Sequence, residues 1–303
     1  MKRIVWALLL AITSARGAVT AQGQRAPAAE PPPPVGALAP ANLAKPRPKP
    51  AFDLTGVWLH GGGQNNSFRF TPPPGTKLTP AAQVHFDAAQ KAQKEGKVYR
   101  DDIGQCWPAG LPVIMTRVWP IAMMQYPTAI YMVSEFMNSL RVVYLDGRPH
   151  SDPDVVVRSF NGESIGTWEK DTLVVDTKYF VGHHHWIDSG IPASEDLHII
   201  ERMKLVNNGQ TLEIEYTFED PKNYEGQWKT TKRWQRTDDR DIAEVSCLPD
   251  LNDHMPSTHS GDNVKCEEVL PCAAPLSARC SRCCPFRRCW PTIRPPASIA
   301  PSR

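Results

Sequence analysis

The sequence predicts an all-β fold, mainly an antiparallel meander of strands that closes into a barrel, with one short helix. After residue 129, short runs of β-branched and aromatic residues alternate with turn signals such as Asp146-Gly147. Helical patterning is confined to one segment before that point. The expected strands mix polar and apolar residues on both sides, which favours a barrel with a partly polar interior over a sandwich with a dry core.

The N-terminal segment has the pattern of a secretory signal peptide. Within residues 1–21, Lys2 and Arg3 precede an apolar run that ends near Ile12, and small residues follow. This run is too short to span a bilayer. We therefore expect a periplasmic or extracellular protein with no integral membrane span after cleavage of the signal peptide.

The rest of the chain divides into three parts by composition. Residues 22–50 are rich in Pro and Ala and predict an extended linker. Residues 51–256 carry the strand pattern and predict the β-barrel-like domain. Residues 257–303 are rich in Cys, Pro and Arg, and this composition predicts a disordered tail.

The expected elements follow in order along the domain. Residues 52–60 form a first extended run, and residues 79–96 predict the helix, because Thr79 can cap it and Pro80 suits its first position. The remaining strands are expected over residues 129–136, 140–145, 163–168, 172–180, 197–206, 211–218, 228–235 and 242–247.

The stretch SEDLHIIERM, residues 194–203, has mixed faces if it is extended. One side carries apolar residues together with Glu195 and Glu201, and the other carries His198 and Arg202. The favoured interpretation of Glu201 and Arg202 is a pair of ordinary rim charges. The alternative is a carboxylate in the barrel interior that exchanges protons with a ligand.

Charge and cysteine content limit the choice of partner and compartment. The formal net charge is +2, but the two terminal segments hold the excess of basic residues, so the domain itself is acidic. This argues against a nucleic-acid partner. Cys106 and Cys247 lie within the domain and could pair in an oxidising compartment, although spacing alone does not assign the pairing.

The stretch GHHHW places three adjacent histidines before Trp186. If the chain is extended here, His183 and His185 point the same way and can bind one divalent metal, with His198 or Glu195 as a third ligand. The alternative is a solvated polar loop. For acid–base chemistry the candidates are Glu195, His198 and Asp188, since carboxylates and histidine are the usual proton carriers.

Tryptophan is frequent in the domain, and flat aromatic walls suit a small organic ligand. Trp58, Trp168 and Trp186 are the candidate walls of a pocket, with Arg202 as a polar contact. Core packing is the alternative role for each tryptophan.

Two resemblances add to these patterns. The stretch FDLTGVWLH, through Gly56 and Trp58, resembles the G-x-W first strand of lipocalin-like proteins. This implies an up-and-down barrel of about eight to ten strands around an apolar cavity. The stretches CWPAGLP, LDGRPH, GTWEKDTLVVDTKYF and SEDLHIIER resemble a broad family of exported bacterial proteins of unknown function, which supports the domain boundaries and implies no activity.

The sequence leaves two kinds of function open. The first is an exported barrel that binds an aromatic, terpenoid or sugar-like compound and acts on it by acid–base or metal-assisted chemistry. The second is a non-catalytic, lipocalin-like ligand carrier or a structural protein of the envelope. The sequence contains no nucleotide-binding glycine loop, G-x-S-x-G elbow or H-E-x-x-H pair.

Overall fold

The computed structural model describes residues 35–62, 66–96, 99 and 102–248. The predicted signal peptide and the predicted tail lie outside the described residues.

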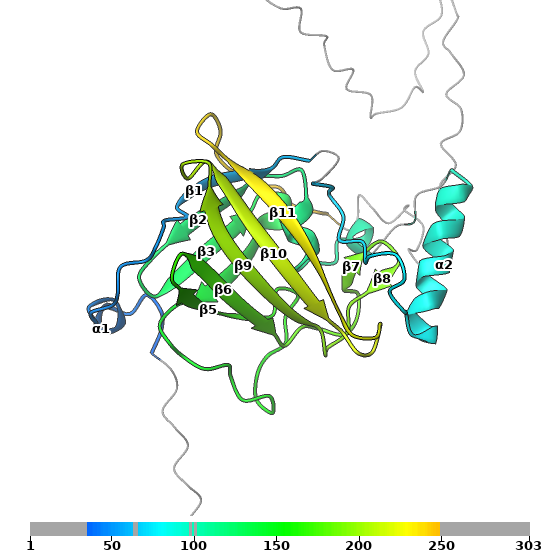
Figure 1. Cartoon of the computed structure of the whole chain (residues 1–303), viewed down its shortest axis with the longest axis horizontal. Helices are drawn as coiled ribbons and strands as arrows, with labels where there is room; N and C mark the ends of the chain where they lie inside the picture. Colours follow the sequence, from blue (N-terminus) through cyan, green and yellow to red (C-terminus); the bar gives the residue numbers. More distant parts are fainter. Residues whose placement is uncertain (1–34, 63–65, 97–98, 100–101, 249–303) are drawn as a thin grey trace, which may run out of the picture.

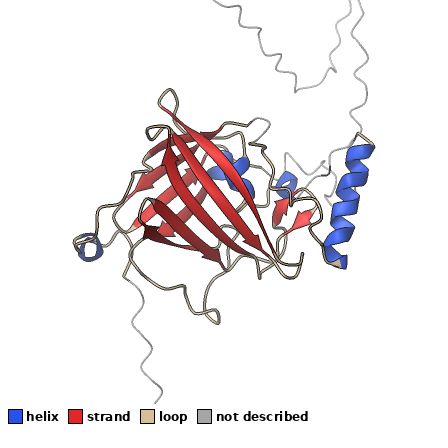
Figure 2. Ribbon diagram, viewed as in Figure 1, coloured by secondary structure: helices blue, strands red, loops and turns tan. Residues whose placement is uncertain are grey.

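The described chain forms a closed nine-stranded barrel, which confirms the all-β prediction (Figures 1 and 2). The strand order is β1-β11-β10-β9-β6-β5-β4-β3-β2, and β1 also pairs with β2 to complete the circle. The strands are β1 (Gly56–His60), β2 (Ile121–Gln125), β3 (Ala129–Ser134), β4 (Ser139–Tyr144), β5 (Glu163–Glu169), β6 (Thr172–Lys178), β9 (His198–Val206), β10 (Thr211–Glu219) and β11 (Gln227–Thr237).

The predicted strands correspond closely to the observed ones. Every run expected between residues 129 and 235 forms a barrel strand, whereas residues 242–247 do not form one. Strand β2 was not predicted, because it is rich in methionine rather than β-branched residues and lies between Pro120 and Pro127. The meander is also interrupted, since β4 and β5 run parallel, with Val143 opposite Ser164.

We call the end of the barrel where β1 begins the mouth, and the opposite end the base. At the mouth lie the turns that join β2 to β3, β5 to β6 and β9 to β10. Residues 35–53 precede β1, and we call them the N-terminal strap. The sequence analysis assigns residues 22–50 to an extended linker, but from Val35 the strap follows the barrel and contains the short helix α1 (Pro40–Leu43).

The other side of the barrel carries helix α2 (Pro80–Lys94) and a two-stranded sheet of β7 (Trp186–Asp188) and β8 (Ile191–Pro192), as Figure 1 shows. The helix prediction is confirmed, and Thr79 caps the helix by accepting the Ala82 N–H. Short 3₁₀ turns are η1 (Asp102–Gln105), η2 (Val113–Thr116) and η3 (Phe136–Asn138). A disulfide joins Cys106 to Cys247, which assigns the pairing that the sequence left open.

None of the helices in the described part of the chain is both long and apolar enough to cross a membrane.

Candidate functional site

Side chains fill the middle of the barrel. Alternate residues of each strand point inward, and the largest of them have almost no exposed surface. Trp58 on β1 is fully buried, its Nε1 donates to the Leu54 carbonyl at 2.8 Å, and the Arg236 guanidinium lies 4.3 Å from its ring centre. Gly56 suits this packing, because its φ is +141° and a Cβ there would lie 2.5 Å from Arg236 Nη1.

A buried ion pair crosses the interior. Arg141 on β4 donates to both carboxylate oxygens of Glu201 on β9, with Nη1 3.0 Å from Oε1. The same guanidinium donates to Ser164 Oγ and Thr177 Oγ1 at 3.1 and 3.2 Å. Glu201 has no exposed surface, so its interpretation as a rim charge is wrong. Its partners match the ionised form, which is what makes a buried charge tolerable.

An aromatic polar group lies next to this pair. Tyr216 on β10 is the ladder partner of Glu201, and burial, followed by the charge of Glu201, raises the pKa of its phenol well above the ordinary value.

His60, whose ring centre is 5.4 Å from that of Trp234, is also buried. Burial, followed by the charge of Lys232, lowers the pKa of His60 to about 4, so this histidine is neutral at pH 7.

A large cavity lies at the mouth of the barrel. It has a volume of about 840 Å³, within the range typical of small-molecule sites. One wall is the N-terminal strap, and the other walls come from the β2–β3 turn, the start of the loop after β4, and Trp168. Its lining residues are Leu43, Lys45, Arg47, Pro48, Lys49, Pro50, Ala51, Phe52, Asp53, Gln125, Tyr126, Pro127, Leu145, Asp146, Gly147 and Trp168.

Aromatic and amide groups hold the inner part of the mouth cavity in place. The rings of Phe52 and Trp168 meet edge to face with centres 4.7 Å apart. The Gln125 side chain ties the strap to β2, because its amide donates to the Phe52 carbonyl at 2.9 Å and accepts the Leu54 N–H at 3.0 Å. This wall is therefore fixed before any ligand arrives.

A second anchor holds the outer part of the strap. The Asp146 carboxylate accepts from Arg148 Nε at 2.8 Å and Nη2 at 2.6 Å, and from Asn42 Nδ2 at 2.9 Å. The hydrogen bond from Arg148 is the main reason that the pKa of Asp146 falls to about 2. Arg148 also donates to the Val35 carbonyl, so the loop after β4 holds both the start of the strap and α1.

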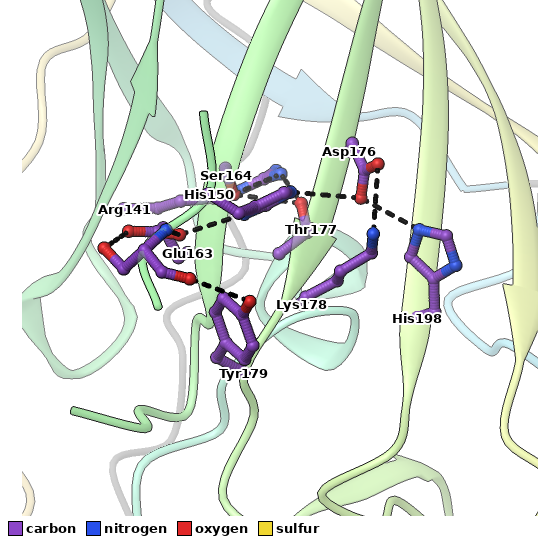
Figure 3. A network of polar contacts seen from close by, with 10 residues as sticks. Arg141, His150, Glu163, Ser164, Asp176, Thr177, Lys178, Tyr179 and His198 are labelled. Atoms are coloured by element: carbon purple, nitrogen blue, oxygen red, sulfur yellow. Dashed lines mark hydrogen bonds and ion pairs between the residues drawn. The ribbon is translucent and has the colours of Figure 1, made fainter. Parts of the chain in front are cut away.

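A separate polar network covers the outer face of β5, β6 and β9 (Figure 3). His198 Nε2 donates to Asp176 Oδ1 at 2.8 Å, and His150 Nε2 lies 3.3 Å from the same oxygen. His150 Nδ1 is 2.9 Å from Glu163 Oε2, and Glu163 also accepts from Ser151 Oγ at 2.5 Å. The network therefore gathers two imidazoles and two carboxylates, which are common acid–base groups, on one face of the barrel.

Both carboxyl groups of the outer network titrate below their ordinary range. Burial raises the pKa of Asp176, but the hydrogen bond from His198 and the charges of His198, Lys178 and His150 outweigh it. Burial likewise raises the pKa of Glu163, and the bonds from Ser151 and His150 lower it further than burial raises it. Both groups are therefore carboxylates at neutral pH.

The predicted catalytic residues do not form one site. Glu195 pairs with Lys222 Nζ at 2.5 Å on the surface. Asp188 is buried on the far side of the barrel from the strap, where it accepts from Thr71 Oγ1 at 2.8 Å and Arg69 Nε at 3.2 Å. Only His198 takes part in the outer network.

The predicted metal ligands are also separate. The extended conformation assumed for the histidine run is wrong, because His184 adopts a left-handed backbone with φ of 53°. His183 is exposed, whereas His185 is buried and its Nε2 donates to the Leu111 carbonyl at 2.7 Å. His198 binds Asp176 instead. Within the described residues, no three His, Cys, Asp or Glu side chains are placed to hold a metal ion.

The predicted ligand-binding residues are dispersed, and one of them lines the mouth cavity. Trp168 does so, while Trp58 belongs to the core. Trp186 is buried in a small cluster that contains residues of α2, and its Nε1 donates to Asp102 at 2.9 Å. Arg202 points outward and pairs with Glu169 at 3.0 Å.

The sequence did not predict that Arg141 pairs with Glu201, or that His150 lies between Glu163 and Asp176. Arg141 has a readable signal, because it alternates with Val143 on one strand as Glu201 does with Ile199 and Met203 on another. Glu163 and Asp176, which lie beside His150, have no such sequence signal, because they occupy ordinary outward positions on their strands.

No protein-family model matches this chain, and no curated protein is similar to it.

Proposed function

We propose that this protein is an exported small-molecule-binding β-barrel whose ligand occupies the mouth cavity. The observation that carries the proposal is a cavity of about 840 Å³ with a fixed aromatic wall, Phe52 against Trp168, at the open end of a filled barrel. An apolar ring inserted there gains contact with rigid side chains at little entropic cost.

Binding without chemistry fits the cavity better than catalysis. No histidine occurs among the described residues that line it. Of its two carboxylates, Asp146 is already occupied by Arg148 and Asn42. The outer network, which has the better acid–base groups, belongs to another face. A carrier that returns its ligand unchanged is therefore the function we favour.

Export is the second part of the proposal. The signal-peptide pattern of residues 1–21 supports it, and so does the disulfide between Cys106 and Cys247, since such bonds persist in oxidising compartments.

The binding proposal is tested with an uncharged fluorescent ligand, N-phenyl-1-naphthylamine, which becomes bright in apolar surroundings. We expect saturable binding that falls about tenfold in Trp168→Ala, since loss of an aromatic contact of about 1.5 kcal/mol corresponds to that factor. The matched control is Trp119→Ala, which removes a half-buried tryptophan outside the cavity. Equal affinities in the two variants would contradict the proposal.

A further inference from the structure

The walls of the mouth cavity differ in charge. The strap wall carries Lys45, Arg47 and Lys49 at alternate positions between prolines. The opposite wall is aromatic or aliphatic, with Tyr126, Trp168 and Leu145. A molecule in this cavity would therefore have an apolar surface on one side and cationic groups on the other.

Among the residues that the structure describes, no acidic side chain forms an ion pair with these three cationic side chains. Arg47 donates to uncharged groups, namely the Asn42 carbonyl and Oδ1 at 2.6 Å each and the Lys45 carbonyl at 3.1 Å. The ion pairs within the described part of the chain include neither Lys45 nor Lys49. Both lysines are exposed and so can turn toward a ligand.

The two carboxylates of the lining do little to cancel this charge. Asp146 is held by the Arg148 guanidinium, which is itself stacked 4.1 Å from the centre of the Tyr144 ring. Asp53 accepts the Thr55 N–H at 2.8 Å, at the point where the strap enters β1. The paired Asp146 and Arg148 contribute no net charge, which leaves three cations against Asp53 alone.

We propose that the ligand of the mouth cavity is an amphipathic anion, an aromatic or aliphatic body that bears a carboxylate, sulfonate or similar group. The body packs on Phe52 and Trp168, and the anionic group meets Lys45, Arg47 and Lys49. This inference rests on the proposed function, since it names the class of ligand for the same cavity.

Two probes of nearly the same shape separate the two proposals. 8-Anilinonaphthalene-1-sulfonate carries the aromatic body of N-phenyl-1-naphthylamine plus one sulfonate. At low ionic strength we expect the full chain to bind the sulfonate about tenfold more tightly than the uncharged probe. This preference should decrease as salt is added, because exposed charges are screened.

The variant Lys45→Gln/Lys49→Gln should bring the ratio of the two affinities, sulfonate over uncharged probe, from about ten to near one. Its matched control is Lys77→Gln/Lys229→Gln, which removes the same two charges from exposed lysines outside the cavity. The control should keep the preference.

Each outcome decides one of the proposals. Equal binding of the two probes by the natural protein, or a preference for the sulfonate that survives the loss of Lys45 and Lys49, overturns the anion assignment and leaves the binding function intact. Absence of binding by either probe overturns the binding function, and the anion assignment with it.

Discussion

The two faces of the same strands differ in how their charged groups are paired and exposed, and Figure 3 places the outer network beside Arg141, Ser164 and Thr177. On β6, Thr177 points inward to the Arg141–Glu201 pair, while its neighbour Asp176 points outward to His150 and His198. The inner pair is fully enclosed, whereas the outer carboxylate is 37% exposed. Neighbouring residues of one strand thus contact two different groups of charges. Removing one member of the buried pair leaves an unpaired buried charge, which is costly, whereas the outer network remains in contact with water when one member is removed.

The largest effect should come from breaking the inner pair. Replacement Glu201→Leu leaves the Arg141 guanidinium buried without a counter-charge, and we expect a loss of about 3–5 kcal/mol in the free energy of unfolding. Urea unfolding followed by tryptophan fluorescence measures it.

The double variant Arg141→Met/Glu201→Leu is the control for this loss. An apolar pair of similar volume removes the stranded charge, so stability should return to near that of the natural protein. A loss below about 1 kcal/mol in the single variant would show that water reaches Arg141 and that the interior is less enclosed than described.

The second prediction extends the comparison to histidine. Burial lowers the pKa of His185 to about 4, against 6.5 for the free side chain. Between these values the unfolded chain binds the proton and the folded one does not, so the free energy of unfolding should fall as the pH drops from 6.5 to 4. The contribution of this histidine is about 3 kcal/mol.

The variant His185→Gln should reduce the slope of unfolding free energy against pH in that interval, whatever its stability at pH 7. Its control is His183→Gln, an exposed histidine of the same loop. Chemical denaturation across the pH range measures both slopes, and an unchanged slope in His185→Gln would mean that His185 is protonated in the folded state.

The smallest effect concerns the outer network. Because Asp176 is partly exposed, Asp176→Asn should lower the free energy of unfolding by about 1 kcal/mol or less at pH 7. The pKa of Asp176 is lowered in the folded state, so its contribution is complete above the ordinary carboxyl value and fades as the pH falls below about 4. The two proteins should therefore converge in acid, and a gap that persists there would indicate a packing defect.

The barrel was predictable because most of its strands bury one face and so alternate in sequence. Strand β10 is an example, with Leu212, Ile214, Tyr216 and Phe218 all fully buried. The same alternation placed Glu201 on the side of Ile199 and Met203, and the structure confirms that side. The pattern did not show that this side is buried, because a carboxylate that faces solvent and one that faces the interior give the same sequence pattern in a single strand.

The candidate site was less predictable for a physical reason. The mouth cavity depends on the strap, whose proline-rich composition indicates an extended chain but not the barrel surface on which it rests. The contacts that place it, such as Asn42 with Asp146, join residues far apart in sequence. The metal-site prediction for the histidine run assumed an extended chain. His184 instead has a left-handed backbone, which no sequence periodicity reveals.

The barrel closes by pairing its first strand with its last, since Val57 to His60 of β1 lie opposite Trp234 to Thr237 of β11. Because β11 is the last strand to be synthesised, one edge of β1 stays unpaired until nearly the whole domain has been made. A chain that stops before β11 leaves the edges of β1 and β10 unpaired. Shortened products should aggregate rather than accumulate as partial barrels.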